Sequence, residues 1–93
     1  MHLNLSPAAR EAAERDLGPD QRLWISFAGG CGALGFRLSA TRRAPGADEV
    51  QVEFPEVSVV LDRMAAAELD GAVLDYDPDE GFVLDHPEWG VSC

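Results

Sequence analysis

RLWISFAGGCGALGFRLSAT, which spans residues 22–41, is the stretch of sequence that decides the fold. Apolar and polar residues alternate on both sides of its glycine-rich centre, over residues 23–27 and again over residues 36–40. This period of two is typical of a β-strand that buries one face. The stretch therefore predicts two strands joined by a glycine-rich loop.

The rest of the chain predicts short elements of both kinds. Ser6-Pro7 is a typical helix start, and the helix it opens should end at Leu17-Gly18-Pro19. Strands are predicted at 50–54, 57–61, 72–76 and 82–85, and a short helix at 63–69. No crossover helices separate the strands, which disfavours a parallel doubly wound sheet. The predicted class is α+β, with an N-terminal helix and about six short strands.

The apolar phase of the predicted strands indicates which side chains form the core. These side chains should be largely buried: Leu23, Ile25, Phe27, Phe36, Leu38, Val50, Val52, Val59, Leu61, Leu69 and Phe82.

Length and charge limit what the chain can be. Its 93 residues fit a single domain, which we take to span 1–93. The net charge is −10, and it is concentrated after residue 43. A surface this acidic repels phosphate backbones and anionic lipid. We therefore expect no nucleic-acid or membrane partner. Residues 1–15 lack the apolar stretch of a signal peptide, and we expect a cytoplasmic protein.

Two motifs point to other functions and are outweighed by their context, and a third kind of site lacks its residues. Residues 30–35 match G-x-G-x-x-G, but a strand pattern follows where a dinucleotide site needs a helix. Asp77, Asp79 and Glu80 resemble the start of a calcium loop, yet the required Gly and Glu are missing, so a solvated acidic turn is favoured. No Ser, His and acid set indicates a nucleophile with its base, so we expect the chain not to be an enzyme.

The two cysteines carry the strongest indication of chemistry. Cys31 lies among glycines that remove side-chain cover, and Cys93 is the last residue of the sequence. Cytosolic thiols are kept reduced, which favours metal or redox chemistry over a structural bridge. A small buried thiol at Cys31, and an incidental or disulfide-bonded Cys93, remain alternatives at this point.

Over nearly its whole length the chain resembles the HesB-like, A-type iron–sulfur carrier family. The resemblance rests on five segments in the family's order, including its Gly-Gly-Cys loop and its Leu-x-Gly-x-x-(Ile/Leu)-Asp-Tyr stretch. They are Leu5–Ala9, Gly29–Ala33, Val59–Asp62, Leu69–Tyr76 and Gly81–Pro87. The resemblance implies a HesB-like α+β domain, with short, mostly antiparallel strands in a compact sandwich or barrel-like arrangement.

The resemblance also implies a function, namely binding an iron–sulfur cluster, or iron, and passing it to apoproteins. Family carriers end in Cys-Gly-Cys, and Cys93 falls at the first cysteine of that pair, so this divergent sequence offers two thiols. A [2Fe–2S] cluster takes four ligands, which a homodimer sharing Cys31 and Cys93 of each chain would supply. His86 stands where the family has Asn and is a further possible ligand. Expected partners are the iron–sulfur assembly machinery and acceptor apoproteins.

Three alternatives remain open from the sequence. The chain could be a cluster-free HesB-like binding or regulatory module, with its acidic surface docking a partner. It could be a dithiol redox protein in which Cys31 and Cys93 form a reversible disulfide. It could also bind zinc through the same two thiols.

Overall fold

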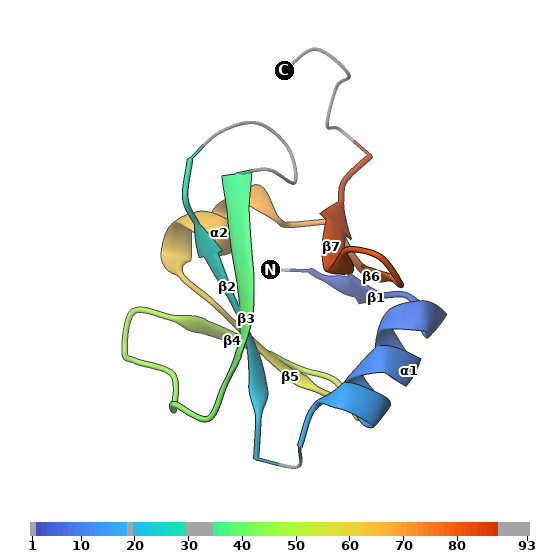
Figure 1. Ribbon diagram of the computed structural model, residues 1–93. Helices are drawn as coiled ribbons and strands as arrows, with labels where there is room; N and C mark the ends of the chain where they lie inside the picture. The colour runs from blue at the N-terminus through green and yellow to red at the C-terminus, as the bar shows by residue number, and fades with distance from the viewer. Residues whose placement is uncertain (1, 19, 30–34, 88–93) are drawn as a thin grey trace.

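The computed structural model describes residues 2–18, 20–29 and 35–87 (Figure 1). Two helices and seven strands lie in these ranges, in an α+β arrangement. In chain order they are β1 (Asn4–Leu5), α1 (Pro7–Asp16), β2 (Arg22–Phe27), β3 (Phe36–Thr41), β4 (Val50–Glu53), β5 (Ser58–Leu61), α2 (Arg63–Glu68), β6 (Val73–Asp77) and β7 (Gly81–Asp85).

The larger sheet, called sheet B here, has the strand order β3-β2-β5-β4. β2 and β3 form an antiparallel hairpin, paired from Arg22↔Thr41 to Phe27↔Phe36. β5 lies on the other side of β2 and runs parallel to it, because β4 is an antiparallel edge strand that brings the chain back. The predicted strands at 23–27, 36–40, 50–54 and 57–61 are thus confirmed.

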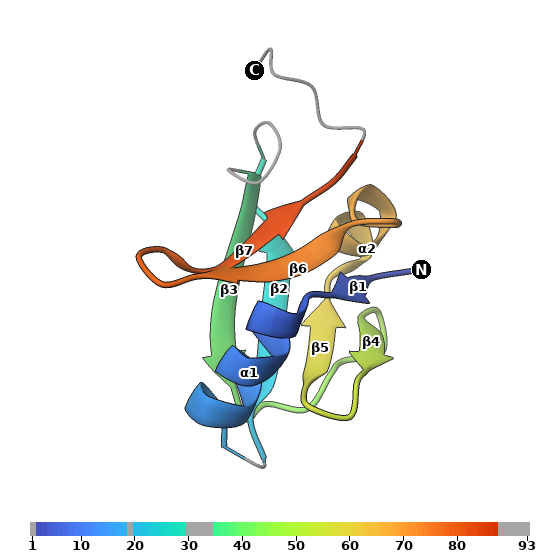
Figure 2. The same ribbon diagram turned by 90° about the vertical axis from the view of Figure 1, so that its right-hand side faces the viewer.

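The smaller sheet, sheet A, has the order β1-β6-β7 and crosses sheet B at a steep angle in Figure 2. β6 and β7 form the second antiparallel hairpin, and β1 pairs with β6 in parallel. The sequence did not predict β1, because two residues are too few for a period of two to show. Of the pairings among the described strands, three are antiparallel and two parallel, which agrees with a mostly antiparallel arrangement.

Helix α1 begins and ends where the sequence predicted. The Ser6 hydroxyl caps it by accepting from the Ala9 amide, and Pro7 occupies the first turn. The buried face is made of Ala9, Ala12 and Ala13, whose small side chains let the helix lie close to β6. The Leu17 N–H donates to the Ala13 carbonyl, which closes the last turn.

The core lies between the two sheets and the helices, and the predicted core residues lie in it or against it. Six of the eleven are buried, namely Leu23, Ile25, Phe36, Val59, Leu61 and Leu69. The other five are partly buried and pack on the same cluster, namely Phe27, Leu38, Val50, Val52 and Phe82. Their partial exposure follows from their position, since they lie on the outer strands or at a strand end.

Candidate functional site

The two predicted ligands, Cys31 and Cys93, lie outside the described residues. Cys31 belongs to residues 30–34, between β2 and β3, and Cys93 to residues 88–93, after β7. That the two thiols come together therefore stays a prediction. What the structure describes is the frame around both segments, and that frame limits what the site can be.

The β2–β3 hairpin holds the ends of the Cys31 segment close together. Beyond the Phe27↔Phe36 pair, the Ala28 N–H donates to the Gly35 carbonyl over 2.7 Å. Gly29 has a φ of +88°, in the left-handed region that favours glycine. The Phe27 and Phe36 rings contact each other with centroids 5.4 Å apart. The segment therefore begins and ends on a paired, well-packed support.

Asp62 connects this support to helix α2. One carboxylate oxygen, Oδ1, accepts from the Ala65 N–H over 2.7 Å and caps α2. The other, Oδ2, accepts from the Phe27 N–H over 2.9 Å at the end of β2. The backbone N–H of Asp62 donates to the Ile25 carbonyl. A single partly buried side chain thus fixes the end of β2 against the start of α2.

His86, the possible nitrogen ligand, is 8% exposed at the end of β7. Its Nε2 lies 2.7 Å from the Asp70 carbonyl oxygen, which can only accept, so this nitrogen donates. The Asp70 carboxylate in turn accepts from the His2 backbone N–H. His86 thereby ties β7 to the turn after α2, and a structural role accounts for its burial without a metal.

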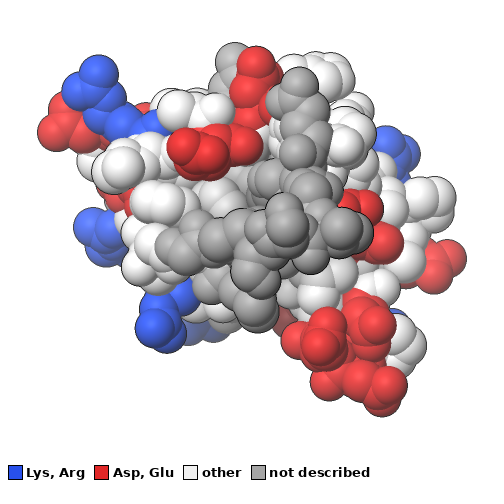
Figure 3. Space-filling view, turned by 90° about the horizontal axis from the view of Figure 1, so that it is seen from above, with Lys and Arg blue, Asp and Glu red and all other residues white. Residues whose placement is uncertain are grey.

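The segments that lead to both cysteines leave the described structure at the same end. In Figures 1 and 2, β2 and β7 both run toward the upper end of the molecule, and β3 starts there. Figure 3 looks down on that end and shows acidic side chains gathered at the corner over the β6–β7 hairpin. Basic side chains lie mainly along the opposite side of this view. The described residues that precede Cys31 and those that precede Cys93 therefore end at the same end of the fold.

The β6–β7 hairpin forms the solvated acidic turn that the sequence predicted. Asp79 and Glu80 are exposed, and the Asp79 N–H donates to the Asp77 carboxylate over 2.7 Å. This bond closes the turn within the hairpin itself. Within residues 2–18, 20–29 and 35–87, no three His, Cys, Asp or Glu side chains come together as a metal site.

Within that hairpin, Asp75 on β6 has a pKa below its ordinary value. The first cause is the Ser6 hydroxyl, which donates to Asp75 Oδ1 over 2.6 Å, and the second is the Tyr76 N–H. Both donors stabilise the charged carboxylate. Asp75 therefore stays ionised at neutral pH while it links sheet A to the start of α1.

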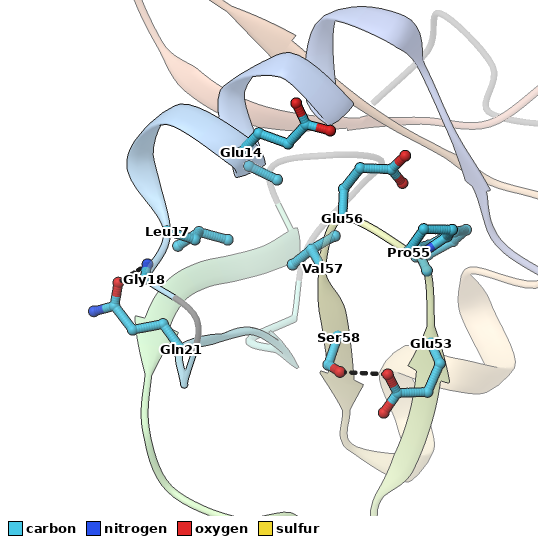
Figure 4. Close-up of a pocket in the computed structure, with 11 residues that line it drawn as sticks. Glu14, Leu17, Gly18, Gln21, Glu53, Pro55, Glu56, Val57 and Ser58 are labelled. Atoms are coloured by element: carbon cyan, nitrogen blue, oxygen red, sulfur yellow. Dashed lines mark hydrogen bonds between the residues drawn. The ribbon is translucent and has the colours of Figure 1, made fainter.

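A hollow of about 280 Å³ lies between the end of α1 and the β4–β5 turn (Figure 4). Glu14, Glu53 and Glu56 line it, and the Ser58 hydroxyl donates to Glu53 over 2.6 Å. One oxygen of Glu56 is buried without a hydrogen-bond partner among the described residues. The sequence did not predict this hollow, because its walls come from two segments that lie far apart in the chain. Ser58 begins β5, whereas Asp62 follows its end, so the hollow and the Cys31 support lie at opposite ends of that strand.

With this geometry in place, comparison with known proteins defines the class. The chain belongs to the iron–sulphur cluster biosynthesis family, whose model matches residues 1–88. The match confirms the resemblance seen in the sequence, and it includes Cys31 but not Cys93. No helix in the described part of the chain has both the length and the apolar character needed to cross a membrane.

Individual relatives and a solved structure are also similar to this chain. Protein Rv2204c of Mycobacterium tuberculosis and Protein Mb2227c of Mycobacterium bovis are each 34% identical over 68 residues. These matches cover 70% of this chain and 57% of each relative, so the chain spans little more than half of their length. The crystal structure of Escherichia coli SufA, a protein involved in the biosynthesis of iron–sulfur clusters, superposes with a TM-score of 0.67. It covers 94% of this chain and 87% of SufA at 21% identity, which establishes the shared fold.

Proposed function

We propose that this protein binds an iron–sulfur cluster as cargo and transfers it to acceptor apoproteins, with Cys31 and Cys93 as ligands. The observation that carries the proposal is the position of Cys31. In a chain of the iron–sulphur cluster biosynthesis family, a cysteine lies in a glycine-rich connection whose ends are joined by the Ala28–Gly35 bond. Thiolates are the usual protein ligands of iron–sulfur clusters.

The residues around Cys31 suit a thiolate ligand. Its neighbours Gly30 and Gly32 leave the backbone N–H groups free of side-chain cover, so these groups can approach sulfur. N–H donors lower the pKa of a thiol and tune a bound cluster. The paired strands below provide a rigid base, and rigid supports hold ligands more accurately than long loops do.

Two thiols per chain require a shared site. A [2Fe–2S] cluster takes four ligands, so a homodimer that contributes Cys31 and Cys93 from each subunit completes the set. Such a cluster should be labile, because loss of the dimer opens half of its coordination positions. Lability suits a protein that must release what it carries.

The partners we propose are the iron–sulfur assembly machinery and the acceptor apoproteins. The net charge of −10 favours partners with basic surfaces and disfavours nucleic acid. The site is proposed to bind and release a cluster, without catalysis by the protein's own side chains.

The test is anaerobic reconstitution with iron and sulfide of the wild type, Cys31→Ala and Cys93→Ala. Ser39→Ala, on an exposed position of β3, is the matched control that removes a small polar group but no thiol. We expect visible iron–sulfide absorbance in the wild type and the control, and little in either cysteine variant. Transfer is then followed by the spectrum that an apo-ferredoxin gains when it is mixed with the loaded protein.

The remaining outcomes separate the alternatives. Equal iron and sulfide in all four proteins would exclude the two cysteines as ligands. A colourless wild type that forms a Cys31–Cys93 disulfide on mild oxidation would favour dithiol redox chemistry. Stoichiometric zinc that is lost in both cysteine variants would favour a zinc protein, and a colourless chain without either property would favour a cluster-free module.

A further inference from the structure

We propose that Asp62 is a positioning residue for Cys31, acting through the end of β2. This inference rests on the proposed function, since it concerns the geometry of the same ligand. The Asp62 carboxylate accepts from the Phe27 N–H at the end of β2 and from the Ala65 N–H at the start of α2. Asp62 should therefore affect where the Cys31 segment starts and the direction in which the chain leaves sheet B.

The Asp62 carboxylate supplies a hydrogen bond that the sheet itself cannot. The parallel pairing of β2 with β5 ends at Ile25↔Leu61, so the Phe27 N–H lies beyond the last pair of strand residues. Asp62 Oδ2 accepts from this N–H over 2.9 Å and extends the ladder by one bond. A charged acceptor makes such a bond shorter and stronger than a neutral one would.

Phe27 and Ala28 are then held from both sides of β2. The Phe27 N–H points to Asp62, and the next N–H, that of Ala28, points to the Gly35 carbonyl on the hairpin side. Two consecutive amides bonded in opposite directions fix the orientation of both peptide planes. Cys31 follows only three residues later.

A small rotation at this point matters for a ligand. Three residues span at most about 10 Å, so a tilt of about 10° at Ala28 could move a group at the far end by about 2 Å. Metal–ligand distances, by contrast, must hold to within about 0.2 Å. Loss of the Asp62–Phe27 bond should therefore weaken the site even if the protein stays folded.

Capping α2 does not by itself require a carboxylate. Serine caps helices about as well as aspartate does, but its shorter side chain carries a single oxygen. A serine at position 62 can accept from Ala65 and cannot also reach Phe27. Asp62→Ser thus removes the bond to β2 and keeps the cap, whereas Ser6→Ala removes the cap of α1, whose second bond goes to Asp75 on β6.

The experiment compares Asp62→Ser with Ser6→Ala in two assays. The first measures the alkylation rate of the Cys31 thiol by iodoacetamide in a Cys93→Ala background, where it is the single thiol. The second measures the half-life of the reconstituted cluster against a chelator in chains that keep Cys93. Circular dichroism verifies that each variant is folded, and Asp62→Asn, which conserves shape but places an amide at one oxygen, is measured in parallel.

We expect Asp62→Ser to shorten the cluster half-life about tenfold, in the range seen when supporting groups of metal ligands are removed. It should also change the Cys31 alkylation rate severalfold, with Asp62→Asn following it, while Ser6→Ala matches the wild type in both assays. Wild-type values in the folded Asp62 variants, or equal losses in Ser6→Ala, would overturn the inference. If the wild type binds no cluster, the proposed function fails, and the alkylation rates still decide the role of Asp62.

Discussion

The two helices that the structure describes both begin with a side-chain N-cap, but the two cap residues bond to different parts of the fold. Ser6 caps α1 and Asp62 caps α2, each by accepting the backbone N–H three residues later. Each cap side chain also bonds a second element. Ser6 donates to Asp75 on β6, and Asp62 accepts from Phe27 on β2.

The difference between the caps follows from their chemistry. A hydroxyl can donate as well as accept, so Ser6 needs an acceptor on the neighbouring strand and finds the Asp75 carboxylate. A carboxylate can accept twice, so Asp62 collects two backbone N–H groups. Ser6 thereby joins a helix to sheet A, whereas Asp62 joins a helix to the strand end from which Cys31 follows. One local motif can therefore stabilise the fold in one place and shape a site in another.

Of the variants that test the difference between the two caps, Asp62→Ala should lower the stability of the fold most. The change removes the cap of α2 and leaves the partly buried Phe27 N–H without its acceptor. Each loss costs about 1 kcal/mol or somewhat more, so we expect a fall of about 2–3 kcal/mol in the free energy of unfolding. Urea denaturation followed by circular dichroism measures it.

The matched control for this variant is Asp20→Ala. Asp20 pairs with Arg42 over 3.2 Å on the surface, with its side chain 68% exposed. Exposed pairs contribute little, so this change should cost less than about 1 kcal/mol. If both variants lost the same small amount, the bond between Asp62 and Phe27 would contribute nothing to the fold.

A smaller effect is expected for Ser6→Ala, the equivalent change at the other cap. It removes the acceptor for the Ala9 N–H and the donor to Asp75, but the Asp75 carboxylate keeps its bond from the Tyr76 N–H. We expect a loss of about 1 kcal/mol, which is a fall of about 4–8 °C in the melting temperature of a domain this size. Differential scanning calorimetry checks this. A loss equal to that of Asp62→Ala would remove the distinction between the two caps.

The contrast between the Ser6 and Asp62 caps also explains which parts of the fold the sequence could predict. Ser6-Pro7 indicates a helix start within two residues, so α1 and its cap were predicted. The bond from Phe27 to Asp62 joins positions 35 residues apart, and no local pattern carries it. The parallel pairing of β2 with β5 is likewise a matter of topology. Alternation identified both strands, but it does not say which strands become neighbours.

Of the candidate site, the sequence could predict only local features, and Cys31 and Cys93 as ligands stay a prediction because they lie outside the described residues. The glycines around Cys31 indicated an open connection, and the structure describes a hairpin whose ends are joined at Ala28 and Gly35. The convergence of the β2 and β7 ends depends on how the two sheets pack, which periodicity does not encode. His86 was a possible ligand in the sequence because of its residue type, and its bond to the Asp70 carbonyl appears only in three dimensions.

The smallest expected effect is on the pH dependence of the free energy of unfolding. Ser6 contributes to this dependence because its hydroxyl lowers the pKa of Asp75. The Ser6 hydroxyl and the Tyr76 N–H lower the pKa of Asp75 in the folded protein, whereas an unfolded Asp has a pKa of about 3.9. A lowered folded pKa contributes stability that is present above the unfolded value and is lost as the pH falls through the folded one. In Ser6→Ala the larger of the two causes is gone, so less stability remains to be lost in acid. The difference in unfolding free energy between wild type and Ser6→Ala should therefore narrow between pH 6 and pH 3, measured by urea denaturation at each pH.

Asp75→Asn should show the same flattened acid response, while Asp79→Asn, which removes an exposed acid from the same hairpin, controls for the loss of one charge. A difference that stays constant over this range would mean that Ser6 stabilises the fold as a helix cap alone, and that its bond to Asp75 has no energetic consequence.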